Sequence, residues 1–390
     1  MKCDIIIPVW NQLEFTRECI EAIIKNTSYP YRLILVDNAS DEATKRYLEG
    51  VRDRSSLEIE LIRNEENLGF VKAVNQGLRI SDSPFVCVMN NDTIPAPGWL
   101  ERMIDFAACH PDVGLINPQC NGHGNMKIDD YARGLAKKRG EYMEMNQCQG
   151  FCMLIKREAV ERVGYLDEAF GIGGFDDTDY SMRAHIAGYR CVAIKDAYVY
   201  HRLHSSFNAS GDREDWVRRN RRIYYDKWGA HLRVGVAVSL NNASRGAISQ
   251  VMTLAYGLAR EWAWVHIWIN SRRERPMIKS EIADFFEKAG LAPHQNIRVD
   301  YFDLPDTLFD VALSGKLLER IRQRMKDKRF DAVVMLDGTA FNILPRIGKI
   351  LKVRIIRRSL GESADGARDA AREIAGAIKL GKTEYASSAV

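Results

Sequence analysis

Short aliphatic runs alternate with amphipathic helical patterns along almost the whole sequence. Residues 5–7 and 85–89 have the β-branched and aliphatic composition of buried strands. Residues 13–24 carry apolar side chains at helical spacing, and Asn11 with Glu14 forms a start that resembles a capping box. Strands that alternate with helices form a sheet whose faces the helices cover. The alternation therefore predicts the α/β class.

The length of the chain and a restart of the pattern predict two domains. A chain of 390 residues is too long for one small core. The alternation begins again after residues 228–230, and residues 234–238 have the composition of a new first strand. We therefore expect one domain at 1–230 and a second α/β domain at 231–390.

Charge and hydropathy limit the partners. The formal net charge is only +4, which favours neither nucleic acid nor a strongly anionic partner. One basic cluster, at 216–222, either contacts an anionic group or is a solvated face above an aromatic anchor. No segment reaches the ~18 apolar residues that span a bilayer, and no signal-peptide core begins the sequence. We expect a cytoplasmic protein that binds no nucleic acid and has at most peripheral contact with the inner face of the membrane.

The polar triplet Asn90-Asn91-Asp92 directly follows the apolar run 85–89. A strand that ends in amide and carboxylate oxygens presents hard metal ligands at the carboxyl edge of a sheet, where open α/β folds bind ligands. The triplet therefore indicates a candidate site for a metal ion and a diphosphate.

A dinucleotide-binding Rossmann domain is disfavoured. Such a domain needs glycines in its first turn so that the backbone approaches the pyrophosphate. The first turn here, at residues 8–12, contains no glycine, and the corresponding turn of the second half, at 239–246, contains one. Nicotinamide and flavin enzymes are therefore poor candidates.

The first domain resembles the family 2 glycosyltransferases of GT-A fold. Five motifs carry the resemblance through their order and spacing: Ile7-Pro8-Val9-Trp10-Asn11, Val36-Asp37-Asn38-Ala39-Ser40, Asn67-Leu68-Gly69-Phe70 with Asn75-Gln76-Gly77, Asn90-Asn91-Asp92, and Phe175-Asp176-Asp177-Thr178-Asp179 with Arg183. The resemblance implies a nucleotide-sugar-binding domain with a mixed sheet flanked by helices.

The same resemblance implies a nucleotide site. Pro8 and Asp37 would line the base and ribose pocket, and Asn67, Lys72 and Asn91 would lie near the nucleoside or the diphosphate. Asp37 also suits the role chemically, because an ionised carboxylate accepts the N–H of uracil or thymine. The alternatives are an Asx-turn for Asp37 and a solvated helix position for Lys72.

The resemblance further implies a divalent cation held by Asp92, which would neutralise charge on the leaving diphosphate. Asn90 occupies the first position of the family's commoner acidic triplet, and its amide ligates without adding charge. His201 matches the family's late histidine, and His204 is a further candidate. Oxygen ligands with one imidazole favour Mn²⁺ or Mg²⁺. The alternatives are a turn cap for Asp92 and a packed or surface position for His201.

Glycosyl transfer to a hydroxyl needs a base that takes its proton. Asp176 and Asp177 match the family's paired acids, and the resemblance implies that the second, Asp177, is the base. Carboxylates that lie close together disfavour shared ionisation, which raises the pKa of one of them toward a useful value. Gly150 and Phe151 resemble the position where the donor sugar and the acceptor approach the backbone. Asp179 belongs to the same sugar site, or it forms an i, i+4 ion pair with Arg183.

The second half resembles, at the level of its pattern, the N-terminal domain of a GT-B glycosyltransferase. Such a domain usually handles the acceptor, so residues 231–390 are expected to be a Rossmann-like acceptor-positioning or docking domain. The polar residues 241–242 and 337–339 follow expected strands, where either a ligand or ordinary turn chemistry explains them.

Together these features predict a metal-dependent glycosyltransferase that uses a UDP- or dTDP-sugar, and the family resemblance implies that it inverts the anomeric centre. The expected reaction is hexosyl or deoxyhexosyl transfer to a glycan, a lipid-linked acceptor or another hydroxyl, in polysaccharide or other glycan biosynthesis. Two alternatives stay open: a non-catalytic nucleotide-sugar-binding or scaffold protein, and a nucleotidyltransferase, which shares a similar sheet.

Overall fold

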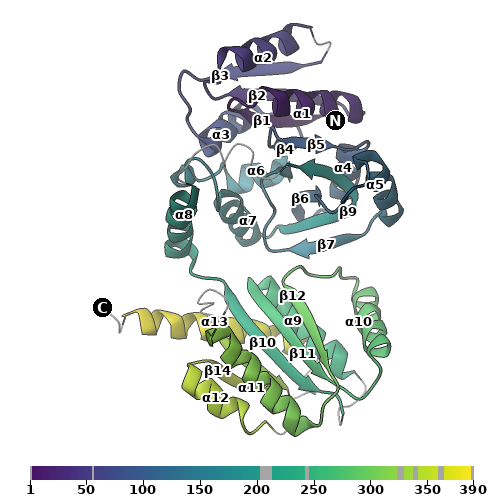
Figure 1. Ribbon diagram of the computed structural model, residues 1–390, viewed down its shortest axis with the longest axis vertical. Coiled ribbons are helices and arrows are strands. Elements are labelled where there is room, and N and C mark those ends of the chain that lie inside the picture. Colours follow the sequence, from purple (N-terminus) through teal and green to yellow (C-terminus); the bar gives the residue numbers. More distant parts are fainter. Residues whose placement is uncertain are drawn as a thin grey trace. The chain divides into compact units, whose positions relative to one another are not determined.

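The chain forms two compact units, Met1–Gly229 and Ala230–Val390. The computed structural model describes residues 2–54, 57–202, 213–241, 246–322, 329–336, 341–358 and 364–387. Each unit contains a β-sheet with helices packed against it (Figure 1). The predicted α/β class is confirmed.

The first unit is built on a nine-stranded mixed sheet with the order β3-β2-β1-β4-β8-β6-β9-β5, in which β7 also pairs with β9. Strands β3, β2, β1 and β4 are parallel neighbours, and β8 runs antiparallel to β4 and β6. The strands are β1 (Cys3–Val9), β2 (Tyr31–Asp37), β3 (Ile59–Arg63), β4 (Phe85–Met89), β5 (Thr93–Pro95), β6 (Val113–Gln119), β7 (Tyr142–Met145), β8 (Cys152–Lys156) and β9 (Arg190–His201).

Helices cover both faces of this sheet. They are α1 (Leu13–Asn26), α2 (Glu42–Arg54), α3 (Phe70–Ile80), α4 (Trp99–Cys109), α5 (Ile128–Leu135), α6 (Arg157–Val163), α7 (Asp176–Ile186) and α8 (Arg213–Trp228), with 3-10 turns η1 (Ala136–Lys138) and η2 (Glu168–Phe170). Ile5 and Ile20 pack in one core, whereas Ile6 and Val74 pack in the core on the opposite face. Burial on both faces explains the continuous apolar run of β1.

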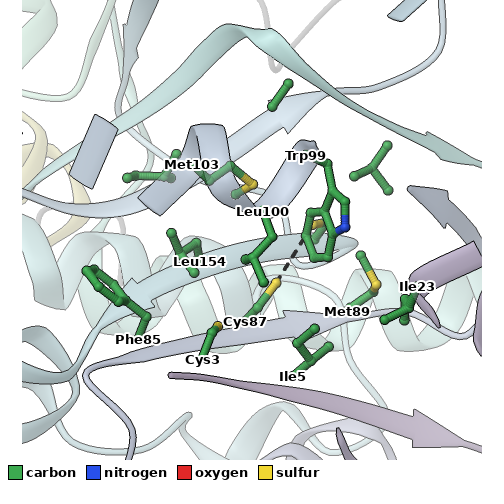
Figure 2. Packing of buried hydrophobic residues seen from close by; sticks show 14 of the residues in the cluster. Cys3, Ile5, Ile23, Phe85, Cys87, Met89, Trp99, Leu100, Met103 and Leu154 are labelled. Atoms are coloured by element: carbon green, nitrogen blue, oxygen red, sulfur yellow. Dashed lines mark hydrogen bonds between the residues drawn. The ribbon is translucent and has the colours of Figure 1, made fainter. Parts of the chain in front are cut away.

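Figure 2 shows part of the first of these cores. Trp99 and Leu100 of α4 lie beside Met89 and Cys87 of β4, and all four side chains are buried. The thiol sulfur of Cys87 is 3.9 Å from that of Cys152 on β8. Because the core locks β4 between its neighbours, the residues that follow Met89 leave the sheet in a fixed position.

The second unit contains a five-stranded parallel sheet with the order β12-β11-β10-β13-β14. Its elements are β10 (Leu232–Ser239), α9 (Ala247–Arg260), β11 (Ala263–Asn270), α10 (Arg275–Ala289), β12 (Ile297–Phe302), α11 (Asp306–Arg322), β13 (Ala332–Leu336), α12 (Leu344–Leu351), β14 (Arg354–Arg358) and α13 (Ala364–Ser387). Helices α9, α10 and α13 contribute to one core and α11 and α12 to another. The predicted second, Rossmann-like sheet is confirmed.

The polar residues at the strand ends of this unit are only partly described. Asn241 follows β10, and its amide donates to Asp306 Oδ1 at 3.1 Å, as does the amide of Asn270. Asn242 and residues 337–339 lie outside the described residues. At Asn241, therefore, an intramolecular hydrogen bond accounts for the polar side chain.

Candidate active site

The turns after β1 and β2 lie at one edge of the first sheet and are tied together. The N–H of Asn11 donates to Ser40 Oγ at 2.8 Å, and the N–H of Asp41 donates to Asn11 Oδ1 at 2.7 Å. Asn11 and Gln12 have positive φ angles of 55° and 60°. Such strained non-glycine conformations concentrate at functional sites. The turn beside the end of β1 is therefore held rigidly.

Asp37 is the last residue of β2, and its side chain is almost fully buried. One carboxylate oxygen accepts the N–H of Ser40 at 2.9 Å, and the other binds the guanidinium of Arg63. Asp37 thus binds the backbone three residues further on, one residue beyond the Asx-turn considered as its alternative, and it also forms an ion pair. A carboxylate offers about four acceptor positions, so acceptor capacity remains for a base or a ribose.

Three further nucleotide candidates lie near this edge with different exposure. Pro8 is partly buried in β1. The side chain of Asn67 accepts the N–H of Gly69 at 2.9 Å, which shapes the turn before α3. Lys72 is exposed in the first turn of α3. Of these, Lys72 has the greatest freedom to reach a diphosphate.

Asn91 is buried behind this edge. Its amide donates to Thr16 Oγ1 of α1 at 2.9 Å, and the residue is 6% exposed. Asn91 therefore anchors α1 to the end of β4, and its side chain is already committed to that contact.

The three metal candidates converge at the end of β4. Asp92 Oδ1 lies 3.3 Å from His201 Nε2, and Asn90 Nδ2 lies 3.4 Å from the same nitrogen. Antiparallel pairing of β5 with β9 places Thr93 opposite His201 and so brings the imidazole to this point. The ring of Phe151 stacks on the imidazole, with centroids 5.2 Å apart.

This donor set fits a hard divalent cation. Among the described residues, no group of three or more Asp, Glu, His or Cys side chains forms a metal site. Asp92 and His201 nevertheless supply one carboxylate and one imidazole, and rotation of the Asn90 amide would add an oxygen. A cation held by these groups would take its other ligands from phosphate oxygens and water, as Mg²⁺ commonly does. His204 lies outside the described residues.

Asp176 and Asp177 begin α7 and differ in their surroundings. Asp176 is buried and accepts the N–H of Gly174 at 2.6 Å. Burial, followed by the charge of Asp177, raises the pKa of Asp176 to about 7. Burial also raises the pKa of Asp177, although the N–H groups of Gly150 and Thr178 donate to this carboxylate at 3.1 and 2.7 Å. These two donors favour the ionised form of Asp177, as expected of a base.

Replacing Asp176 by asparagine is expected to stabilise the protein at pH 8 and to have little effect near pH 4. A carboxyl whose pKa is raised on folding binds its proton more tightly in the folded state, so the free energy of unfolding falls as pH rises from about 4 through about 7. Asparagine removes this loss and keeps an oxygen for Gly174. Denaturant unfolding at both pH values should show a gain on the order of 2 kcal/mol at pH 8 only. An equal gain in the free energy of unfolding at both pH values would contradict the link between stability and the pKa of Asp176.

A continuous series of contacts joins the carboxylate pair to the metal candidates. Asp177 accepts the N–H of Gly150, the next residue Phe151 stacks on His201, and His201 contacts Asp92. A Cβ added to Gly150 would lie 3.7 Å from Asp177 Cβ, so the segments that carry these two residues are in close contact. The structure therefore brings five of the candidates into one cluster.

Asp179 lies outside this series of contacts. It is fully buried, and its carboxylate accepts from Arg183 Nε, Lys227 Nζ and Trp228 Nε1 at 2.8 Å each. The geometry favours the ion pair with Arg183 that was the alternative for this residue. Asp179 fastens α7 to α8, and a sugar would have to displace three donors to reach it.

Helix α8 also holds the loop that precedes the carboxylate pair. The amide nitrogen of Asn220 lies 2.8 Å from the carbonyl oxygen of Phe170, 2.9 Å from that of Gly173 and 3.1 Å from that of Gly174. Asn220 is 1% exposed. Phe175, with a φ angle of 70°, forms the strained entry to α7. Asn220 therefore acts as a clamp on residues 170–174, and no motif in the sequence had singled it out.

Asn220→Ala is expected to lower kcat roughly tenfold while leaving the Kd for donor nearly unchanged. The substitution leaves buried carbonyl groups with one fewer donor and loosens the support of Asp176 and Asp177. Steady-state kinetics measure the change in kcat, and titration of the donor measures the change in Kd. Arg218→Ala is the matched control, because Arg218 is exposed on the same helix and pairs with Asp215 at 3.1 Å rather than with Asn220. Equal effects of both substitutions would contradict the clamp.

The basic cluster at 216–222 has ordinary partners. Arg218 pairs with Asp215 at 3.1 Å, and Arg222 lies 3.7 Å from Asp226, all on the exposed side of α8. Tyr224 is buried in the first unit. The cluster is therefore a solvated face above an aromatic anchor, the second of the two readings of the sequence.

A cavity of about 740 Å³ lies in the second unit. It runs between α9 and α10, and Tyr256, Phe285 and Lys288 are among its lining residues. No candidate from the sequence lines it. The chemistry-bearing side chains and this cavity are thus in different units.

Comparison with known proteins connects this cluster with a family. The sequence model described as Glycosyl transferase family 2 matches residues 4–164. The chain carries a family 2 glycosyltransferase domain. The predicted family is therefore confirmed, and Pro8, Asp37, Asp92, Gly150 and Phe151 lie within the matched residues.

Curated relatives resemble the same part of the chain. Glycosyltransferase AglE of Haloferax volcanii is 25% identical over 50% of this chain and 66% of its own length. The glycosyltransferase YwdF of Bacillus subtilis is 24% identical over 58% of this chain and 82% of its own length. An uncharacterised protein, y4gI of Sinorhizobium fredii, is 26% identical, and the match spans only 27% of its length. The chain thus spans less than two thirds of the length of two of these three relatives.

Solved structures that partly resemble this chain include two complexes with nucleotide sugars. A mannosyltransferase from Pyrobaculum calidifontis in complex with GDP-Man and Mn²⁺ has a TM-score of 0.46 and 18% identity, covering 84% of this chain and 83% of that one. Staphylococcus aureus TarS 1–349 in complex with UDP-GlcNAc has a TM-score of 0.45 and 14% identity, covering 84% and 90%.

Proposed function

We propose that this chain is a metal-dependent, inverting glycosyltransferase that moves a hexosyl or deoxyhexosyl group from a UDP- or dTDP-sugar to a hydroxyl acceptor. The observation that carries the proposal is the contact series from Asp177 through Gly150, Phe151 and His201 to Asp92. Asp177 contacts Gly150 at one end of this series, and the proposed cation ligands Asp92 and His201 lie at the other end. The family 2 domain over residues 4–164 supports the reaction class.

In the proposed reaction a single displacement occurs at the anomeric carbon. The acceptor oxygen forms a bond to this carbon while the bond from carbon to the diphosphate oxygen breaks, and the hydroxyl proton moves to Asp177. The backbone N–H groups of Gly150 and Thr178 hold Asp177 in position. A positioned base of this kind typically contributes 10²–10⁴-fold to the rate. Asp177 therefore supplies the proton-accepting step.

The leaving side of the reaction depends on Asp92 and His201. A divalent cation, Mn²⁺ or Mg²⁺, would neutralise the charge that grows on the departing nucleoside diphosphate. Asp92 and His201 hold ligating atoms 3.3 Å apart, and Phe151 fixes the imidazole plane. Asp37, at the end of β2, is the proposed acceptor for the base or ribose. Its buried position gives it a defined orientation.

A donor screen tests the proposal. Nucleoside diphosphate release should be measured across common activated sugars with Mn²⁺, with Mg²⁺ and with neither. We expect metal-dependent release of UDP or dTDP that an added hydroxyl acceptor accelerates. Binding of nucleotide without turnover for any donor would favour the scaffold alternative. Release of pyrophosphate from a nucleoside triphosphate would instead identify a nucleotidyltransferase.

The acceptor and the second unit belong to the same proposal. A glycan, a lipid-linked saccharide or another hydroxyl compound is the proposed acceptor, in glycan biosynthesis on the cytoplasmic side. The parallel sheet of residues 231–390 is proposed to position or dock that acceptor. Deleting residues 231–390 while measuring donor hydrolysis and transfer separately would show which half-reaction needs this unit.

A further inference from the structure

Helix α12 exposes isoleucine side chains on the surface of the second unit. Ile350 is 73% exposed and Ile343 is 40% exposed, although isoleucine is among the residues most often buried. With the partly buried Ile347 they follow i, i+4, i+7 spacing and share one side of the helix. Leu344 and Gly348 face the core instead. The exposed stripe is therefore separate from the helix face that stabilises the fold.

Cations surround this stripe. Residues 341–358 contain six Lys or Arg and no Asp or Glu. Arg346, Lys349 and Lys352 are exposed on α12 or at its end, and helical spacing places Arg346 directly beside the isoleucines. We call this surface the α12 patch, and it consists of Ile343, Arg346, Ile347, Lys349, Ile350 and Lys352.

The cations of the neighbouring strand have a simpler explanation. Strand β14 is an edge strand of the second sheet, and charged side chains on such an edge prevent pairing with other chains. Arg354 donates to Ala377 O at 2.8 Å, and Arg357 donates to Phe341 O at 3.3 Å. Edge protection accounts for these two residues. It does not account for exposed isoleucines on a helix.

We propose that the α12 patch binds an anionic lipid membrane surface. Aliphatic side chains bordered by Lys and Arg match the boundary between acyl chains and charged headgroups. A soluble polyanion would pair with the cations and leave Ile343 and Ile350 in water. Within the described segments, no helix is long and apolar enough to cross a bilayer. The patch therefore attaches the second unit to a membrane without insertion of a spanning helix.

Vesicle sedimentation of the full chain tests the proposal. We expect binding to vesicles of phosphatidylcholine with phosphatidylglycerol and much weaker binding to phosphatidylcholine alone. Ile350→Ser should lower the partition coefficient roughly tenfold, because the burial of one isoleucine side chain is lost. Lys349→Glu should lower it roughly fivefold or more, because each cation at an anionic surface contributes about that factor. Circular dichroism of both variants checks that these surface changes leave the fold intact.

A matched pair of double variants distinguishes membrane binding through the α12 patch from a general effect of the protein's net charge. Ile350→Ser with Lys349→Glu changes α12, and Met277→Ser with Lys279→Glu makes the same change in charge on exposed positions of α10. Loss of binding only in the α12 pair supports the proposal. Equal loss in both pairs, or equal binding to the two kinds of vesicle, overturns it. Unchanged vesicle binding by Ile350→Ser together with strong, Lys349-dependent heparin binding would also overturn it, in favour of a polyanion site.

Discussion

Asp177→Asn should lower kcat by roughly 10²–10⁴-fold while the Kd for the nucleotide-sugar stays within about twofold of wild type. Asparagine keeps the size of the side chain and one oxygen, so one of the two N–H groups of Gly150 and Thr178 keeps its acceptor. It cannot accept a proton from the attacking hydroxyl. Turnover measured as nucleoside diphosphate release, and donor affinity measured by calorimetry, separate the loss of chemistry from a loss of binding.

Asp176→Asn is the informative comparison for this result. Both carboxylates lie at the start of α7, but only Asp177 is joined to Gly150 by a hydrogen bond. If Asp177 is the base, its variant should lose far more activity than the Asp176 variant. Normal turnover by Asp177→Asn would show that another group takes the proton.

Asp92→Asn should abolish the effect of Mn²⁺ on nucleotide binding and reduce turnover by about 10²-fold or more, because the charge on the cation supplies several kcal/mol of stabilisation to the leaving group. Asparagine preserves the shape of the side chain and the backbone bond from Arg202 N–H to Asp92 O. The measurement is titration of UDP and dTDP into both proteins, with and without Mn²⁺.

The comparison of metal responses guards against a simple folding defect. Wild type should bind UDP or dTDP more tightly when Mn²⁺ is added, whereas the variant should bind equally in both conditions. Asp53→Asn, at an exposed site on α2, should behave as wild type. A variant of Asp92 that responds to Mn²⁺ as strongly as wild type would remove this residue from the metal site.

Local patterns were sufficient to predict the sheets and one edge of the site. Strand β4 is short, apolar and followed at once by three polar residues, so its end could be located before any coordinates existed. Parallel neighbours then necessarily bring Asp37 of β2 to the same edge. The position of His201 was anticipated by resemblance, and its contact with Asp92 depends on the β5–β9 pairing.

Local sequence patterns could not predict the contacts between distant segments. Arg63 lies opposite Asp37 only because β2 and β3 pair in that register. Asn220 contacts residues 170–174 from α8, which comes after α7 and β9 in the chain. In the sequence it looks like any other polar residue of a helix. The bond from Lys227 to Asp179 is of the same kind. Tertiary packing created all three, and no local spacing encodes them.

Gly150 donates its N–H to Asp177, the proposed proton acceptor, and the neighbouring Phe151 stacks on the imidazole of His201. A shift of this backbone would therefore displace both the proposed base, Asp177, and the proposed metal ligand, His201. In the proposed reaction neither end could change position in isolation, because Gly150 and Phe151 are adjacent residues directly before β8.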